Sequence, residues 1–129
     1  MFITIRTDNP EAEIGLYDGK NQLSYHKWQA DRKLAKELLA TIRDELKKQS
    51  ADWSDITGVV AYEGPGSFTG LRIGITVADS IAYGNNIPIV GAQGDDWISA
   101  GLARLIAGET DRLVLPHYGA EANITLPKK

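Results

Sequence analysis

The sequence has no cysteine in its 129 residues, and its only histidines are His26 and His117. Without cysteine the chain can form neither a disulfide bond nor a thiolate metal site. Two histidines alone are also few for a zinc site. We therefore expect no metal-binding residues in this chain.

Long apolar runs and an excess of basic residues are missing as well. No apolar run approaches the roughly 20 residues of a membrane span, and the amino terminus enters a strand pattern without a signal peptide. The formal net charge is −3 at pH 7, so the chain has no basic footprint for binding nucleic acid unaided. We expect a soluble, cytoplasmic protein without membrane contact, in which residues 1–129 form a single domain with a short tail at 116–129.

The apolar segments and the turns between them predict an α/β fold with a mixed sheet. Three short β-branched runs predict an antiparallel opening of three strands, with Asp18-Gly19 as a hairpin turn. The expected elements are strands 2–6, 13–17 and 23–28, helix 31–48, strand 58–62, helix 70–83, strand 87–90, helix 97–106 and strand 112–115. Up to residue 106, this order matches one lobe of the actin-like (RNase H-like, ASKHA) fold.

Two of these helices carry distinctive stripes. The first has leucine and isoleucine at spacings of three and four, which is the pattern of an amphipathic helix. The second has small residues at every fourth position, which allows close packing of a neighbouring helix or sheet. The small stripe consists of Gly70, Gly74, Ala78 and Ala82. Each stripe is explained either by packing on the chain's own sheet or by contact with a second protein.

Residues 64–74 form a glycine-rich segment between an apolar strand and a helix. A loop at a helix start points backbone N–H groups at one spot, so it predicts either an anion cradle or a rigid corner. The loop lacks the lysine of a P-loop, because Leu71 and Arg72 follow Gly70. It also lacks the third glycine of a dinucleotide loop and the glycine spacing of a nucleophile elbow.

The stretch 63–74, Glu-Gly-Pro-Gly-Ser-Phe-Thr-Gly-Leu-Arg-Ile-Gly, resembles the signature loop of the bacterial TsaB (YeaZ) family. Residues 87–91 resemble the Ile-Pro-x-Val-Gly strand of that family, and residues 116–118 and 126–129 resemble its carboxyl-terminal end. The signature loop comprises Gly64, Pro65, Gly66, Ser67, Phe68, Thr69, Gly70 and Arg72.

The resemblance implies a non-catalytic subunit in the synthesis of threonylcarbamoyladenosine beside the tRNA anticodon. It implies a heterodimer with TsaD, contact with TsaE and a homodimer when TsaD is absent. Metal and ATP are expected on the partners, and tRNA contact only through the complex. The implied interface uses the first two helices, through Leu34, Leu38, Leu39, Ile42, Leu71, Gly74, Ile75 and Ala78. We expect a bulky residue at Gly74 or Ala78 to block pairing but to leave the monomer folded.

The sequence also departs from that family. By comparison with that family we expect most of the second lobe to be missing, and Arg6 stands where the family's first strand tends to end in Asp. Both departures weaken the alternative hypothesis of a small phosphate- or nucleotide-binding ATPase that uses residues 64–70. Peptidase activity is a third hypothesis, but we place no catalytic residue, and Glu63 and His117 are interpreted as structural.

Overall fold

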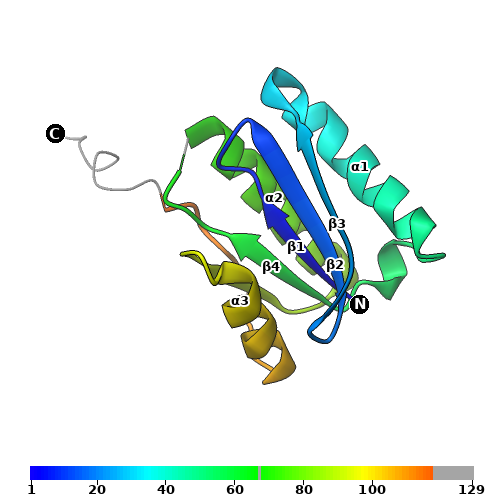
Figure 1. Cartoon of the computed structure of the whole chain (residues 1–129). Helices are drawn as coiled ribbons and strands as arrows, with labels where there is room; N and C mark the ends of the chain where they lie inside the picture. Colours follow the sequence, from blue (N-terminus) through cyan, green and yellow to red (C-terminus); the bar gives the residue numbers. More distant parts are fainter. Residues whose placement is uncertain (67, 118–129) are drawn as a thin grey trace, which may run out of the picture.

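The computed structural model describes residues 1–66 and 68–117 (Figure 1). Three strands open the chain, and helices then alternate with strands, which confirms the predicted order up to residue 106. The elements are β1 (Phe2–Arg6), β2 (Glu11–Asp18), β3 (Asn21–Gln29), η1 (Asp31–Lys33), α1 (Leu34–Lys48), η2 (Trp53–Asp55), β4 (Gly58–Tyr62), α2 (Phe68–Asn85), β5 (Ile89–Ala92) and α3 (Trp97–Ile106).

The five strands form one mixed sheet in the order β3-β2-β1-β4-β5. The pairs β1–β2 and β2–β3 are antiparallel, whereas β1–β4 and β4–β5 are parallel. Both β4 and β5 are buried along their whole length, which explains their continuous apolar sequences. This is the sheet of an actin-like (RNase H-like) lobe.

Helices cover the two faces of the sheet unequally (Figure 1). α1 and α2 pack side by side on one face, where α1 contacts β2 and α2 contacts β1, β4 and β5. α3 lies on the opposite face and contacts β4 and β5. Two buried stripes therefore point inward from α1 and α2, and the outer sides of these two helices form a surface of their own.

The small-residue stripe of α2 faces the sheet. A Cβ atom at Gly74 would lie 2.0 Å from the Thr7 Oγ1 atom at the end of β1. Ala78 is completely buried, and Ala82 is 3% exposed. Of the two explanations that the sequence left open for this stripe, close packing on the chain's own sheet is the one found.

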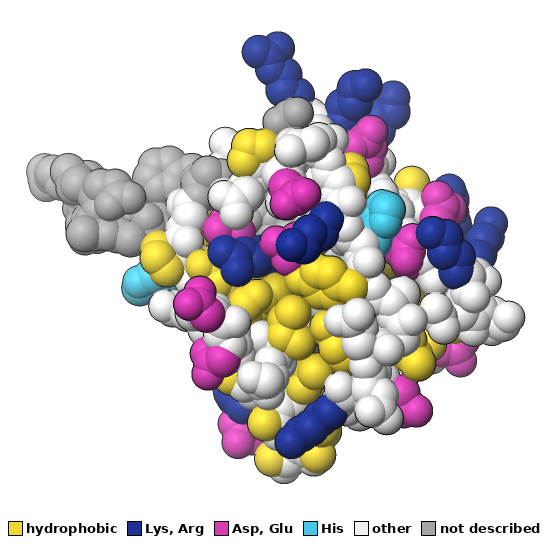
Figure 2. Space-filling view, in the orientation of Figure 1, with side chains coloured by type: hydrophobic (Ala, Val, Ile, Leu, Met, Phe, Trp, Pro, Cys, Tyr) yellow, Lys and Arg dark blue, Asp and Glu magenta, His cyan; other side chains and the backbone are white. Residues whose placement is uncertain are grey.

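Aromatic side chains cover part of the sheet face that α3 leaves open. Tyr17 and Tyr25 lie against Gly15, where an added Cβ atom would be 2.7 Å and 2.8 Å from their rings. Beneath them the Thr4 hydroxyl is buried without a hydrogen-bond partner among the described residues. Burial raises the pKa of the Tyr25 hydroxyl, which donates a hydrogen bond to Glu13. Figure 2 shows apolar side chains gathered in the middle of this face.

The predicted strand at 112–115 is wrong, because side chains occupy the free edge of β5 instead. The Ile89 N–H donates to Thr110 Oγ1 over 3.1 Å, and the Gly91 N–H donates to the Asp111 carboxylate over 2.8 Å. The Arg104 guanidinium holds this carboxylate at 2.6 Å. Two side chains thus satisfy backbone donors that another strand would otherwise bind.

Candidate functional site

The signature loop joins β4 to α2 and packs against neighbouring backbone. Gly64 has φ = +116°, and an added Cβ atom there would lie 2.1 Å from the His117 carbonyl oxygen. At Gly66 an added Cβ atom would lie 2.4 Å from the Cβ atom of Asp8. Both positions need glycine because any side chain would overlap a neighbour. These glycines therefore allow close packing, as in the rigid-corner interpretation of the loop.

The turn after β1 carries a charge pair beside this loop. The Arg6 Nε atom donates to Asp8 over 2.7 Å, and the guanidinium lies 4.0 Å from the centre of the Tyr62 ring. The hydrogen bond to Asp8 raises the pKa of Arg6 above its usual range. Arg6 and Asp8 thus balance each other's charge beside the loop, and the Asp8 Cβ atom occupies the space next to Gly66.

Hydrogen bonds fasten the loop at both ends. The Glu63 N–H donates to the Ala92 carbonyl at 3.0 Å, and the His117 N–H donates to the Glu63 carbonyl at 2.7 Å. The Thr7 hydroxyl donates to the Gly70 carbonyl at 2.7 Å. Glu63 and His117 are thus joined through their backbones, in keeping with the structural interpretation of both residues.

Ser67 and residues 118–129 lie outside the described part of the chain. The signature-loop prediction at Ser67 therefore has no structural counterpart here, and the same is true of the family ending at 126–129. Phe68 is described as the first residue of α2. Thr69 and Arg72 are exposed in the first turns of that helix.

The predicted interface residues divide sharply by burial. Leu39 is 50% exposed. The other seven are buried in this chain's own core: Leu34, Leu38, Ile42, Leu71, Gly74, Ile75 and Ala78. A partner that docks on these helices would meet Leu39 and not the buried seven. Because Gly74 lies against Thr7, the structure also corrects the expectation that a bulky residue there leaves the monomer folded.

The outer sides of α1 and α2 nevertheless form an apolar surface, which we call the α1–α2 seam. It is a shallow groove of about 380 Å³ that includes Trp53 from the middle of the α1–β4 connection. Its lining residues are Leu39, Trp53, Val77, Ser80 and Ile81. Leu39 follows the buried Leu38, and Val77 precedes the buried Ala78. A wider apolar arc on the helical wheel of α2 would therefore have added Val77 to the predicted interface residues, which already include Leu39. No comparable sequence pattern predicts that Trp53 lines the seam, because this residue lies in the short turn η2.

The described residues contain neither a membrane-spanning helix nor a metal-binding cluster. Among residues 1–66 and 68–117, no helix combines the length and the apolar character needed to cross a bilayer. In the same part of the chain, histidine, aspartate and glutamate do not gather in groups of three that could hold a metal ion.

Comparison with protein families gives a match over the central part of the chain. The matching family is described as TsaD, tRNA N6-adenosine threonylcarbamoyltransferase, and the match covers residues 27–95. This range includes α1, β4, the signature loop, α2 and β5. The chain therefore belongs to the TsaD family, within which it is a TsaB (YeaZ) member.

Individual relatives agree with this assignment. The chain is 34% identical over 89 residues to the tRNA threonylcarbamoyladenosine biosynthesis protein TsaB of Escherichia coli, a match that covers 64% of this chain and 38% of that protein. It is 39% identical over 64 residues to the tRNA N6-adenosine threonylcarbamoyltransferase of Geotalea daltonii, covering 50% of this chain and 19% of the relative.

A solved structure, YeaZ from Pseudomonas aeruginosa, superposes with a TM-score of 0.66 at 26% identity. The superposition covers 71% of this chain and 43% of YeaZ. The chain thus spans less than half the length of each of these three relatives.

Proposed function

We propose that the chain is a non-catalytic assembly subunit for threonylcarbamoyladenosine synthesis on tRNA, and that it pairs with TsaD through the α1–α2 seam. The observation that carries this proposal is an apolar surface on helices that already bury their other faces. Leu39 is half exposed, and Trp53 and Val77 are partly exposed beside it. The names of the relatives, which include both TsaB and the transferase, supply the process.

The groove between the packed helices α1 and α2 suits a partner that presents helices. A helix of the partner can place its side chains in the groove between α1 and α2, as ridges pack into grooves in helix pairs. Ordinary stable interfaces bury about 1,600 Å² in total. Each apolar Å² removed from water contributes roughly 25 cal/mol, so a seam of this kind supplies the core of an interface, and polar residues around it supply the rim.

The same surface accounts for the other partners that we propose. Two copies of the chain can join through their seams in an isologous dimer when TsaD is absent. Contact with TsaD would end that homodimer because both use the same residues. In this proposal metal, ATP and the catalytic groups belong to the partner subunits, TsaE joins the assembled complex, and tRNA is bound by the complex as a whole.

The alternative function, a small phosphate-binding or ATPase-like enzyme, receives less support from the loop. The Asp8 Cβ atom lies against Gly66 and the carbonyl oxygen of His117 lies against Gly64, so neighbouring groups fill space beside the loop that an anion would need. We therefore propose the assembly role first.

Co-expression with TsaD followed by size-exclusion chromatography with mass determination tests the proposal. We expect a one-to-one complex for the unaltered chain and its loss in Leu39→Asp, which places a charge at the seam, and in Ser80→Arg, which fills it. Leu113→Asp is the matched control, because Leu113 is 59% exposed and lies outside the seam. A complex that survives both seam variants would show that TsaD binds elsewhere, and absence of any complex would refute the assembly role.

A further inference from the structure

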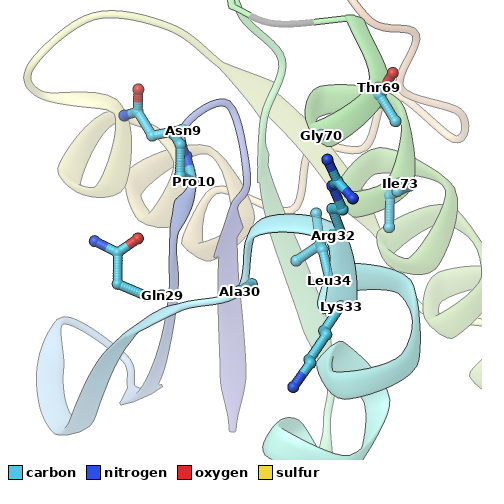
Figure 3. A pocket seen from close by; sticks show the side chains of 10 residues that line it. All are labelled: Asn9, Pro10, Gln29, Ala30, Arg32, Lys33, Leu34, Thr69, Gly70 and Ile73. Carbon is cyan, nitrogen blue, oxygen red and sulfur yellow. The ribbon is translucent and has the colours of Figure 1, made fainter.

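A second, larger groove lies away from the seam, at the start of both α1 and α2. It has a volume of about 820 Å³ and is open to solvent. Its walls come from the β1–β2 turn, the end of β3, η1 and the first turns of α2 (Figure 3). We call it the helix-start groove. It shares no lining residue with the α1–α2 seam.

Two cations line this groove without a counter-ion. Arg32 and Lys33 are exposed, and within the described part of the chain neither side chain forms a hydrogen bond or an ion pair. Figure 3 shows Arg32 extending from η1 toward Gly70 and Ile73 of α2, while Lys33 points away from α2. Arg32 is thus placed to contact the part of a ligand that lies inside the groove. Lys33 is placed to contact a part that extends out of it.

The position of these cations is electrostatically unfavourable in the free protein. They end η1 and directly precede the amino end of α1, where the helix dipole favours negative charge. Neither Ala30, which precedes η1, nor Lys33, which precedes α1, provides a capping side chain. A carboxylate bound here would pair with Arg32 and would also face the positive end of the α1 dipole. Local conflicts of this kind are expected at functional sites.

The remaining lining indicates what else the ligand carries. Pro10 and Ile73, with the buried Leu34 beside them, give the groove an apolar floor, which suits an aliphatic side chain. Asn9 and Gln29 stand on the opposite wall, and their amides both donate and accept hydrogen bonds (Figure 3). A peptide backbone offers both partners to such amides, whereas a phosphate group only accepts.

From these three features we propose that the helix-start groove binds an extended acidic peptide segment of a partner protein. A carboxylate of the segment pairs with Arg32, a neighbouring aliphatic side chain enters the apolar floor, and Asn9 and Gln29 bind the backbone. This binding site is separate from the surface assigned to TsaD, so it does not depend on the proposed function.

Selection from a random peptide display library against the immobilised full-length chain tests the proposal. We expect enrichment of sequences in which aspartate or glutamate stands beside leucine, isoleucine or valine. The enriched peptides, made synthetically, should bind Arg32→Glu at least about tenfold more weakly, because the contact becomes a repulsion. Ile73→Ala should weaken the aliphatic contact in the same assay. Lys20→Glu changes the net charge equally but lies in the β2–β3 turn, and it should bind as the unaltered chain does.

Several outcomes would overturn the proposal. Enrichment of no sequence, or of sequences without acidic residues, would do so, and so would equal binding to Arg32→Glu. Displacement of the peptides by inorganic phosphate at equal ionic strength would assign the groove to a phosphate ligand instead. Loss of peptide binding when the chain dimerises would assign the helix-start groove to a second copy of this chain. Circular dichroism of each variant verifies folding, and Arg32→Glu should still co-purify with TsaD if the seam carries that contact.

Discussion

Two glycines of α2 show how differently one residue type is used within one helix. Gly74 lies against the Thr7 side chain, whereas an added Cβ atom at Gly84 meets no atom within 4 Å. Alanine is the better helix former at both positions, by up to about 1 kcal/mol. At Gly74 the overlap with Thr7 opposes this gain, since overpacking typically costs about 1–3 kcal/mol.

The two alanine substitutions should therefore shift stability in opposite directions. We expect Gly74→Ala to lower the free energy of unfolding and Gly84→Ala to leave it unchanged or to raise it slightly. Urea unfolding followed by circular dichroism measures both. Equal stability of the two variants would mean that Thr7 rotates away without cost.

Asp79 gives a prediction of pH dependence at the residue scale. Its carboxylate accepts the Val114 N–H over 2.9 Å, but burial raises its pKa above the ordinary value. A raised carboxyl pKa means that the folded state favours the protonated form, so this group destabilises the fold as pH rises above about 4. Asparagine keeps the acceptor oxygen and has no charge to bury. We expect Asp79→Asn to be more stable than the unaltered chain at pH 7, with the difference vanishing below about pH 4.

At the scale of elements, the bonds along β5 predict the opposite pH dependence. The Arg104 guanidinium lowers the pKa of the Asp111 carboxyl, and this carboxylate also accepts the Gly91 N–H. A lowered pKa contributes stability that is present above about pH 4 and is lost as pH falls further. The pair is partly exposed, so its contribution is about 1 kcal/mol or less.

Asp111→Asn should thus be less stable than the unaltered chain at pH 7 and should approach it below about pH 4. Hydrogen exchange of the Gly91 amide gives a local measurement, because this N–H loses its charged acceptor. Faster exchange at Gly91 without a change at Val60, in the centre of the sheet, is the expected result. An unchanged rate would indicate that Asp111 does not protect this edge.

Most elements could be predicted from local sequence, and the exceptions have local causes. The boundaries of β1, β4 and α3 agree with the prediction because turn residues bound them closely. β5 begins at Ile89, two residues late, because Pro88 has no N–H for the sheet. The apolar run 112–115 resembles a strand, but Thr110 and Asp111 occupy the β5 edge beside it. Hydrophobic periodicity does not show that side chains, and not a strand, bind the free edge of β5.

At the scale of the whole molecule, the layered arrangement explains why the sequence-based interface differs from the exposed one. Periodicity shows which residues share a face of a helix but not what covers that face. Leu38 and Ile42 meet this chain's own sheet, and Leu39 is left outside. The helix-start groove was also beyond prediction, because it joins Asn9, Arg32 and Ile73 from separate elements. Only the folded chain brings these residues together.

The proposed seam predicts the oligomeric state of the isolated chain. We expect a concentration-dependent homodimer and a monomer of 14.1 kDa in Leu39→Asp, because the charge would have to be buried without a partner. Analytical ultracentrifugation over a range of concentrations measures this equilibrium. A dimer of unchanged stability in Leu39→Asp would place the contact between copies elsewhere, and Leu113→Asp serves again as the control.

The side chains that occupy the β5 edge have a consequence for self-association. A sheet with two free edges can add copies at both ends without limit, which is the route to fibrils. Here Thr110 and Asp111 take the hydrogen-bonding positions at one edge, and β3 is the edge strand at the other. Pairing of two β3 strands would exhaust the available edges, so any growth of the sheet through the described strands stops at two molecules. The side chains on the β5 edge thereby prevent open-ended growth through the edges of the sheet.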